Sequence, residues 1–307
     1  MKTKPFNSRP GFRGFRLIIL GSLIGVCGGN SSVLADGAPV LPPLTSVSGN
    51  PRLPGKFVWA DLVTDDVSVA SKFYQSLFGW TFRSTGNYLI AANNERPLCG
   101  MFQKPRPEGR NAKPRWFGYL SIGNVEKAQK TVSKLGGQVL APAQKFPKRG
   151  EQAVFSDPEG AVFGVVKSSA GDPEDFLADP GDWIWIQLLS RDASRAAKFY
   201  SQVGGFDALE NSQTNRLSDF VLTSRGYARA TVRTIPKQDA QVDPGWLLFV
   251  RVTNVVESAA QAKQLGGKVL LDPKPELLQG KVAVVADPTG APIGLLQWSE
   301  ELLQKGR

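Results

Sequence analysis

The chain has 307 residues, of which 41% are hydrophobic and 21% charged, and it contains no histidine. This balance is typical of globular proteins and excludes a disordered chain, and the length suits about two domains. The net charge is +10, but residues 1–35 hold five bases and no acid, which leaves 32 bases against 27 acids, or +5, in the rest. Because these bases form no cluster, the sequence predicts no nucleic-acid partner.

The N-terminus has the pattern of an export signal. A basic stretch ends at Arg16, the apolar run 17–27 follows, and a small-residue segment leads to Val33 and Ala35, which suit a signal-peptidase site. The apolar run is too short to span a bilayer, which needs ~20 residues. We therefore predict an exported, periplasmic protein. It is either soluble or lipid-anchored at Cys27, although Val26 before that cysteine suits lipid processing poorly.

Cysteine usage agrees with export. Cys27 and Cys99 are the two cysteines of the chain. If Cys27 is removed with the signal or lipidated, Cys99 has no partner for an intrachain disulfide, and no CxxC motif surrounds it. We interpret Cys99 as a small core residue of a strand.

An internal repeat follows. Residues 57–80 (FVWADLVTDDVSVASKFYQSLFGW) match residues 183–206 (WIWIQLLSRDASRAAKFYSQVGGF) at an offset of 126. Further on, Trp116 pairs with Trp246 and Asp157-Pro158 with Asp287-Pro288, at an offset of 130. Such self-similarity indicates duplication. We predict a signal at 1–35, a linker rich in Pro, Gly and Ser at 36–56, domains at 57–168 and 183–299, a linker at 169–182 and a tail at 300–307.

Each copy alternates strands and helices in the same order. In the first copy, a strand is predicted at 56–64, a helix capped by Asp65 or Asp66 and running to residue 78, and strands at 80–83, 88–92 and 98–103. The unit then recurs, with a strand at 117–122, a helix at 125–135 capped by Asn124, and strands at 138–140, 153–156 and 162–167. The pattern predicts an α+β fold in which each domain pairs two βαβββ modules.

This order of motifs resembles the glyoxalase/bleomycin-resistance/extradiol-dioxygenase group, the vicinal oxygen chelate superfamily. Its markers here are a strand followed by D-x(6)-FY and then GW or GF, with Asp-Pro-x-Gly-Ala before the last strand, and they occur twice. The resemblance covers about residues 57–167 and 183–298. It implies modules that curve into a cleft where a divalent metal holds the substrate, and a single-chain counterpart of the family's common dimer, so we expect a monomer.

The metal ligands of the family have no counterpart in this sequence. The resemblance places them on the first and last strands of each module, at positions occupied by Trp59, Phe117, Gly164 and a residue near Met101, then by Trp185, Leu247, Gly294 and a residue near Val232. A divalent ion needs several nitrogen, oxygen or sulfur donors. Aromatic, aliphatic and glycine side chains do not supply them, so we predict no metal and no cofactor.

Strand alternation indicates what faces each cleft instead, because every second residue shares a face. It places Val58, Ala60 and Leu62 on the helix side. It predicts ligand-binding residues at Trp59, Asp61, Phe117 and Tyr119 in the first cleft and at Trp185, Gln187, Phe249 and Arg251 in the second. Gly164 and Gly294 are expected to leave open space.

Each of these residues also has a structural interpretation. The two tryptophans either plug the clefts or form platforms for a ligand. Asp61 is a solvated rim residue or an ion-pair partner, Tyr119 a core residue, and Arg251 half of a salt bridge between modules or domains.

Three functions are therefore open. The first is a metal-free module that binds a small, partly apolar molecule, since aromatic walls with few polar groups suit such a site. The second is a glyoxalase-like lyase or isomerase with Asp61 or Tyr119 as general base, for which the sequence shows no convergent acid–base pair. The third is a protein-interaction module with filled clefts. We favour binding, with the ligand unidentified and the catalytic residues unknown.

Overall fold

The computed structural model describes residues 41–45, 49–104, 113–211 and 218–298. The predicted signal, Cys27 and the C-terminal tail lie outside these residues. None of the helices within the described ranges is long and apolar enough to cross a membrane.

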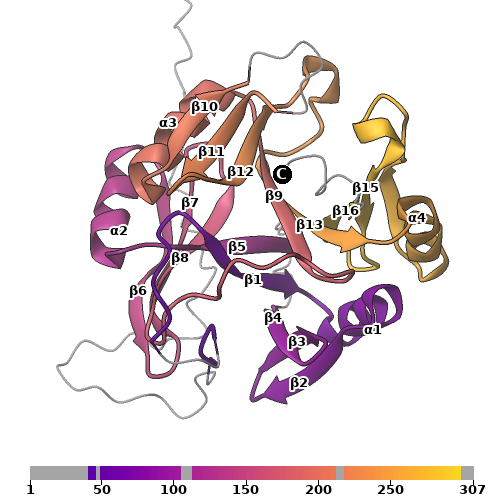
Figure 1. Ribbon diagram of the computed structural model, residues 1–307, viewed down its shortest axis with the longest axis horizontal. Coiled ribbons are helices and arrows are strands. Elements are labelled where there is room, and N and C mark those ends of the chain that lie inside the picture. Colours follow the sequence, from indigo (N-terminus) through magenta and orange to yellow (C-terminus); the bar gives the residue numbers. More distant parts are fainter. Residues whose placement is uncertain (1–40, 46–48, 105–112, 212–217, 299–307) are drawn as a thin grey trace, which may run out of the picture.

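The first sheet has eight strands in the order β2-β3-β4-β1-β5-β8-β7-β6 (Figure 1). Its strands are β1 (Phe57–Thr64), β2 (Thr81–Thr85), β3 (Tyr88–Asn93), β4 (Arg96–Gln103), β5 (Arg115–Ser121), β6 (Gln138–Phe146), β7 (Gly150–Ser156) and β8 (Val162–Ser168). The helices of this copy are α1 (Val67–Phe78) and α2 (Val125–Lys134). The pairs β1–β4 and β5–β8 are parallel and the other neighbours antiparallel, as expected of two βαβββ modules joined at β1 and β5.

The second sheet repeats this order as β10-β11-β12-β9-β13-β16-β15-β14. Its strands are β9 (Trp183–Ser190), β10 (Asp207–Glu210), β11 (Phe220–Ser224), β12 (Tyr227–Thr234), β13 (Gly245–Val252), β14 (Lys268–Leu271), β15 (Val282–Ala286) and β16 (Pro292–Gln297). Helices α3 (Ala193–Gly204) and α4 (Val255–Gln264) and the 3-10 turns η1 (Lys237–Asp239) and η2 (Leu278–Gly280) complete it. The predicted α+β architecture, with its fold present twice, is confirmed.

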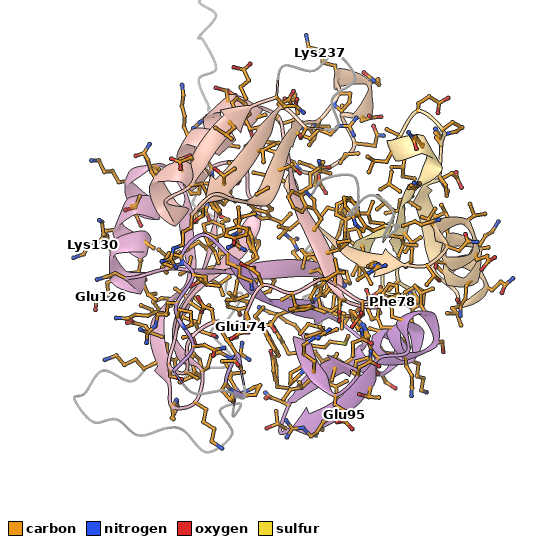
Figure 2. The ribbon with its side chains drawn as sticks, viewed as in Figure 1. Phe78, Glu95, Glu126, Lys130, Glu174 and Lys237 are labelled. Carbon is orange, nitrogen blue, oxygen red and sulfur yellow. The ribbon has the colours of Figure 1, made fainter. Side chains whose placement is uncertain are left out.

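The helices begin and end where the sequence predicts. Asp66 and Asp192 accept hydrogen bonds from the backbone N–H groups of the first turns of α1 and α3, and Asn124 does the same for α2. Gly79 ends α1 in the left-handed region, at φ 74°, which glycine adopts without strain. Figure 2 shows Glu126 and Lys130 on the outer side of α2, whereas Val132 of the same helix is buried.

The two copies share one hydrophobic core. A single cluster of buried residues contains α1, α2, α3 and α4 side chains together with the sheet faces beneath them. In Figure 1, α1 lies beside α4 and α2 beside α3, and both pairs are in contact. Aromatic rings cross the boundary, with Trp116 and Trp183 5.2 Å apart and Phe57 and Trp246 4.9 Å apart between ring centroids.

The repeat motifs also bond each copy to the other. Tyr74 of the first FY motif donates to Asp287 Oδ2 of the second Asp-Pro turn at 3.0 Å, and its oxygen accepts from Trp116 Nε1 at 2.8 Å. Tyr200 of the second motif repeats this pattern with Asp157 Oδ2 at 3.2 Å and Trp246 Nε1 at 2.9 Å. The motifs that identify the repeat therefore also join its two halves.

Candidate functional site

Each sheet has an inner face, defined here as the face without helices. On β1, Ala60 and Leu62 enter the shared core, as predicted, and Trp59 lies on the inner face. Val58 was expected on the helix side, and this was wrong, because it clusters with Trp59. The register of β1 against β5 shifts between residues 57 and 59, so a β-bulge at Val58 reverses the alternation there.

A buried polar cluster lies on the inner face of the first domain. Asp61 Oδ1 accepts hydrogen bonds from Tyr88 Oη at 2.5 Å and from Trp59 Nε1 at 3.0 Å. Asp61 is only 4% exposed, so the interpretation of it as a solvated rim residue was wrong. Burial raises the pKa of the Asp61 carboxyl, while its bonds to Tyr88, Tyr119 and Trp59 and the charge of Arg149 oppose that rise. The same burial, with Asp61 beside them, holds the pKa values of Tyr88 and Tyr119 well above their ordinary range.

A segment of the predicted N-terminal linker covers this cluster. Leu41 and Leu44 are buried in the same apolar cluster as Trp59, Phe117 and Tyr119. Arg149, 1% exposed, lies over the Trp59 ring at 4.3 Å from its centroid and donates from Nε to the Pro42 carbonyl oxygen at 2.6 Å. The described part of the linker is therefore packed against the sheet, and it closes the inner face of the first domain.

The glycines at the family's ligand positions do not leave open space, contrary to expectation. A Cβ on Gly164 would lie 2.3 Å from Tyr119 Cδ1, and one on Gly294 would lie 2.2 Å from Phe249 Cδ1. Gly100 on β4 has the same relation to Tyr88, whose hydroxyl oxygen would be 1.8 Å away. Each glycine thus lets an aromatic ring of a neighbouring strand lie against the backbone.

The residues at the family's metal positions do not fit a metal ion. Met101 and Val232, counted from the sequence as the fourth positions, enter the core instead, and the inner-face residues there are Gly100 and Thr231. Asp61, a carboxylate opposite Gly100 and Phe117 in the sheet, already bonds Tyr88 and Trp59. Within the described residues, no group of three or more His, Cys, Asp or Glu side chains is placed to hold a metal.

The inner face of the second domain differs from that of the first. Trp185 and Gln187 are partly exposed, and both donate to Thr231 Oγ1, at 3.0 Å from Trp185 Nε1 and 3.2 Å from Gln187 Nε2. Leu247 and Phe249 form the apolar floor of a small cluster, against which Trp185 packs. Trp59 is therefore buried in the first copy, whereas Trp185, at the equivalent position of the second copy, is partly exposed.

Arg251 is at one end of this face rather than in its middle. Its side chain is 8% exposed, and its Nη1 donates to the Ala178 carbonyl oxygen at 2.5 Å. Its backbone exchanges hydrogen bonds with Gly181 and Asp182. Arg251 thus binds the linker between the domains, and the salt bridge expected of it stays a prediction.

Four residues of the two inner faces were not singled out from the sequence: Tyr88, Arg149, Thr231 and Arg229. Strand alternation could have indicated Thr231 on β12, the neighbour of β9, and Tyr88 on β3, which is separated from β1 by β4. Arg149 lies in a turn and Arg229 at a bulge of β12, where alternation gives no guidance.

Comparison with known proteins agrees with this architecture. The model of the Glyoxalase/Bleomycin resistance protein/Dioxygenase superfamily matches residues 56–165. A relative from Mycobacterium bovis named putative glyoxylase CFP32 is 28% identical over 256 residues, covering 78% of this chain and 93% of its own length. The anthracycline biosynthesis protein DauV of a Streptomyces species is 27% identical over 264 residues, covering 80% and 94%.

Solved structures share the fold at low identity. The Mn(II)-bound glyoxalase of Novosphingobium aromaticivorans has a TM-score of 0.53 at 16% identity, covering 80% of this chain and 82% of its own. The 2,3-dioxygenase LapB of Pseudomonas sp. KL28 has a TM-score of 0.53 at 11% identity, covering 80% and 94%. The family model therefore places residues 56–165 in the glyoxalase/bleomycin resistance/dioxygenase superfamily, and the second copy repeats the sheet order of the first.

Proposed function

We propose that this protein is exported and binds a small, flat, partly apolar molecule, without a metal ion, on the inner face of its second domain. Two relatives are named for glyoxylase activity and for anthracycline biosynthesis, and both names concern small organic molecules. The sequence pattern of residues 1–35 supports export to the periplasm, and the duplication supports a monomer.

The difference between the two inner faces carries this proposal. In the first domain, Trp59 and Tyr119 are 4% and 3% exposed beneath Leu41 and Leu44. In the second domain, Trp185 is partly exposed, next to apolar side chains and two neutral hydrogen-bonding groups, Gln187 and Thr231. Aromatic walls with few polar groups are typical of small-molecule sites.

The residues of the first domain support binding rather than catalysis. Asp61 and Tyr119, the candidate bases, are both buried, and Asp61 already bonds Tyr88 and Trp59. A general base must come within hydrogen-bonding reach of the substrate proton that it removes. In this conformation the covering segment keeps a substrate away from both candidates.

Native mass spectrometry of the mature protein, purified from the compartment to which it is exported, tests the proposal. We expect a mass excess over the denatured polypeptide that corresponds to one organic molecule, and loss of that excess in Trp185→Ala. A matched control is Val256→Ala, which removes an exposed apolar side chain, 61% exposed, from α4 on the helix side. A divalent metal ion as the excess mass, or an organic excess unchanged in Trp185→Ala, would contradict the proposal.

A further inference from the structure

The linker between the domains passes over one end of the second inner face. Arg251 on β13 binds the carbonyl of Ala178, and Arg229 on β12 binds Asp175. Since β9 lies between β12 and β13 in the sheet, residues 175–178 cross the start of β9, the strand that carries Trp185. The linker therefore borders the site proposed above.

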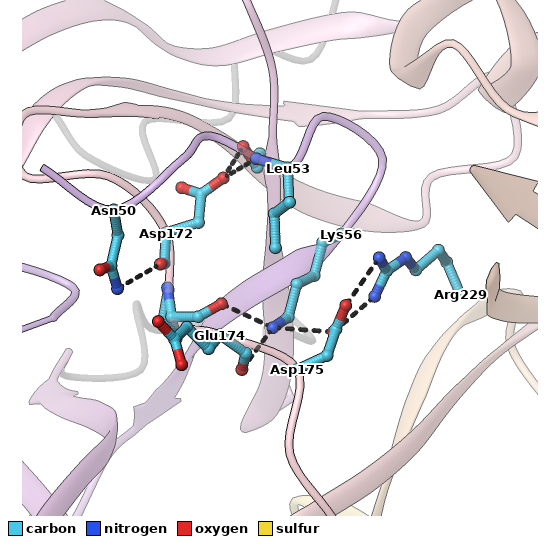
Figure 3. A network of polar contacts seen from close by, with 9 residues as sticks. Asn50, Leu53, Lys56, Asp172, Glu174, Asp175 and Arg229 are labelled. Atoms are coloured by element: carbon cyan, nitrogen blue, oxygen red, sulfur yellow. Dashed lines mark hydrogen bonds and ion pairs between the residues drawn. The ribbon is translucent and has the colours of Figure 1, made fainter. Parts of the chain in front are cut away.

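Asp175 is held there by two cations, as Figure 3 shows. Arg229 Nη1 and Nη2 bind its two carboxylate oxygens at 2.6 and 3.0 Å, and Lys56 Nζ lies 3.0 Å from Oδ1. Lys56 also donates to the backbone carbonyls of Pro173 and Glu174. The hydrogen bonds from Arg229 are the largest cause that lowers the pKa of Asp175, so this carboxylate is ionised at neutral pH.

Arg229 has bonding capacity beyond its contact with the linker. The side chain of Arg229 is 8% exposed, and its Nε is buried without a hydrogen-bond partner among the described residues. In the parallel pairing of β12 with β9, Thr231 lies opposite Gln187, and Arg229 lies two residues before Thr231 on β12. Trp185 donates to Thr231, so a buried guanidinium with one unused donor lies two residues along β12 from the hydroxyl that Trp185 bonds.

We propose that the ligand carries a carboxylate, which Arg229 binds in place of Asp175 while the planar part of the ligand lies against Trp185. This inference rests on the proposed function and names the chemical class of its ligand. Asp175 is the internal substitute for the ligand carboxylate, because the guanidinium fork of Arg229 matches a carboxylate with two parallel bonds.

Charge balance and chain conformation both permit a ligand carboxylate to replace Asp175 on Arg229. Asp175 has a 41% exposed side chain on a linker segment without regular secondary structure, so its displacement breaks no strand pairing. When the ligand occupies Arg229, Asp175 keeps its ion pair with Lys56. Each of the two cations then has one carboxylate, so no buried charge is left without a counterion.

Two probes of the same shape test this inference: 2-naphthoate and its neutral analogue 2-naphthalenemethanol. Binding is measured by isothermal titration calorimetry on the full mature chain. We expect the wild type to bind the acid at least about tenfold more tightly than the alcohol, a difference that one charge-assisted bidentate pair can supply. Asp175→Asn should strengthen binding of the acid several-fold, because it removes the competing carboxylate, and Arg229→Gln should abolish the preference while leaving the alcohol unaffected.

Asp179→Asn is the matched control. Asp179 is a carboxylate of the same linker, 59% exposed, but it lies 3.9 Å from Arg96 of the first domain, so the substitution should leave both affinities unchanged. Equal binding of acid and alcohol, both weakened in Trp185→Ala, would overturn this inference and leave the proposed function in place. A preference for the acid that persists in Arg229→Gln would also overturn it. If neither probe binds, the inference fails, and native mass spectrometry decides the proposed function separately.

Discussion

Replacing Tyr74 with phenylalanine should destabilise the whole protein, because the Tyr74 hydroxyl bonds one copy to the other. The substitution leaves the ring in place and removes the oxygen that accepts from Trp116 Nε1 and donates to Asp287 Oδ2. The other oxygen, Asp287 Oδ1, accepts hydrogen bonds from the backbone N–H groups of Thr289 and Ala291 in the turn that follows. The change therefore leaves one buried donor and one buried acceptor without their partner.

The magnitude follows from those two groups. A buried polar group without a partner costs about 1–3 kcal/mol. With one such donor and one such acceptor, we expect Tyr74→Phe to lower the free energy of unfolding by ~2–6 kcal/mol. Tyr200→Phe should cost about the same, because Tyr200 makes the equivalent bonds to Asp157 and Trp246.

Urea unfolding followed by both circular dichroism and tryptophan fluorescence measures this cost. Because the core is shared, the two signals should coincide in a single transition in the wild type and in both variants. Tyr227→Phe is the control, since Tyr227 is 60% exposed and its hydroxyl should contribute less than about 0.5 kcal/mol. A cost for Tyr74→Phe no larger than this control, or a first transition confined to one copy, would refute the reasoning.

Two further predictions concern the first inner face. Burial raises the pKa of Asp61, so its contribution to stability is present below the ordinary aspartate pKa of about 4 and is lost as pH rises through the raised value. In Asp61→Asn, the free energy of unfolding should not fall with pH for this reason, so its difference from the wild type should change between pH 4 and 7. A difference that stays constant over this range would contradict the prediction. Gly164→Ala should cost about 1–3 kcal/mol in urea unfolding, because its Cβ would overlap the Tyr119 ring. Gly123→Ala, with nothing within 4 Å, should cost far less, and equal costs would contradict the packing.

The fold could be predicted from the sequence because its information is local and occurs twice. Helix caps such as Asp66 and Asn124 are recognised from neighbouring residues, and the repeated FY and Asp-Pro motifs gave the order of elements. The repeat also indicated which residues are equivalent. It could not indicate that Tyr74 and Asp287 bond across the two copies, because no local rule connects residues that far apart in sequence.

The site was predicted less well, for two physical reasons. The first reason is that a β-bulge reverses the alternation of side chains along a strand. A bulge at Val58 puts this residue on the inner face of β1 instead of the helix side. A second register shift, at Leu98 of β4, precedes Met101. The second reason is long-range packing. Leu41 and Leu44 lie in a stretch rich in proline and glycine, so composition predicted an extended linker, and only the folded structure places them in one buried cluster with Trp59.

The central claim is that the inner face of the first domain is closed and that of the second is accessible. Hydroxyl-radical footprinting of the native protein, read by mass spectrometry at single tryptophans, tests it most directly. The account predicts that Trp185, partly exposed, is oxidised readily and that Trp59, 4% exposed beneath Leu41 and Leu44, is protected. Equal oxidation of the two tryptophans, or faster oxidation of Trp59, would contradict it.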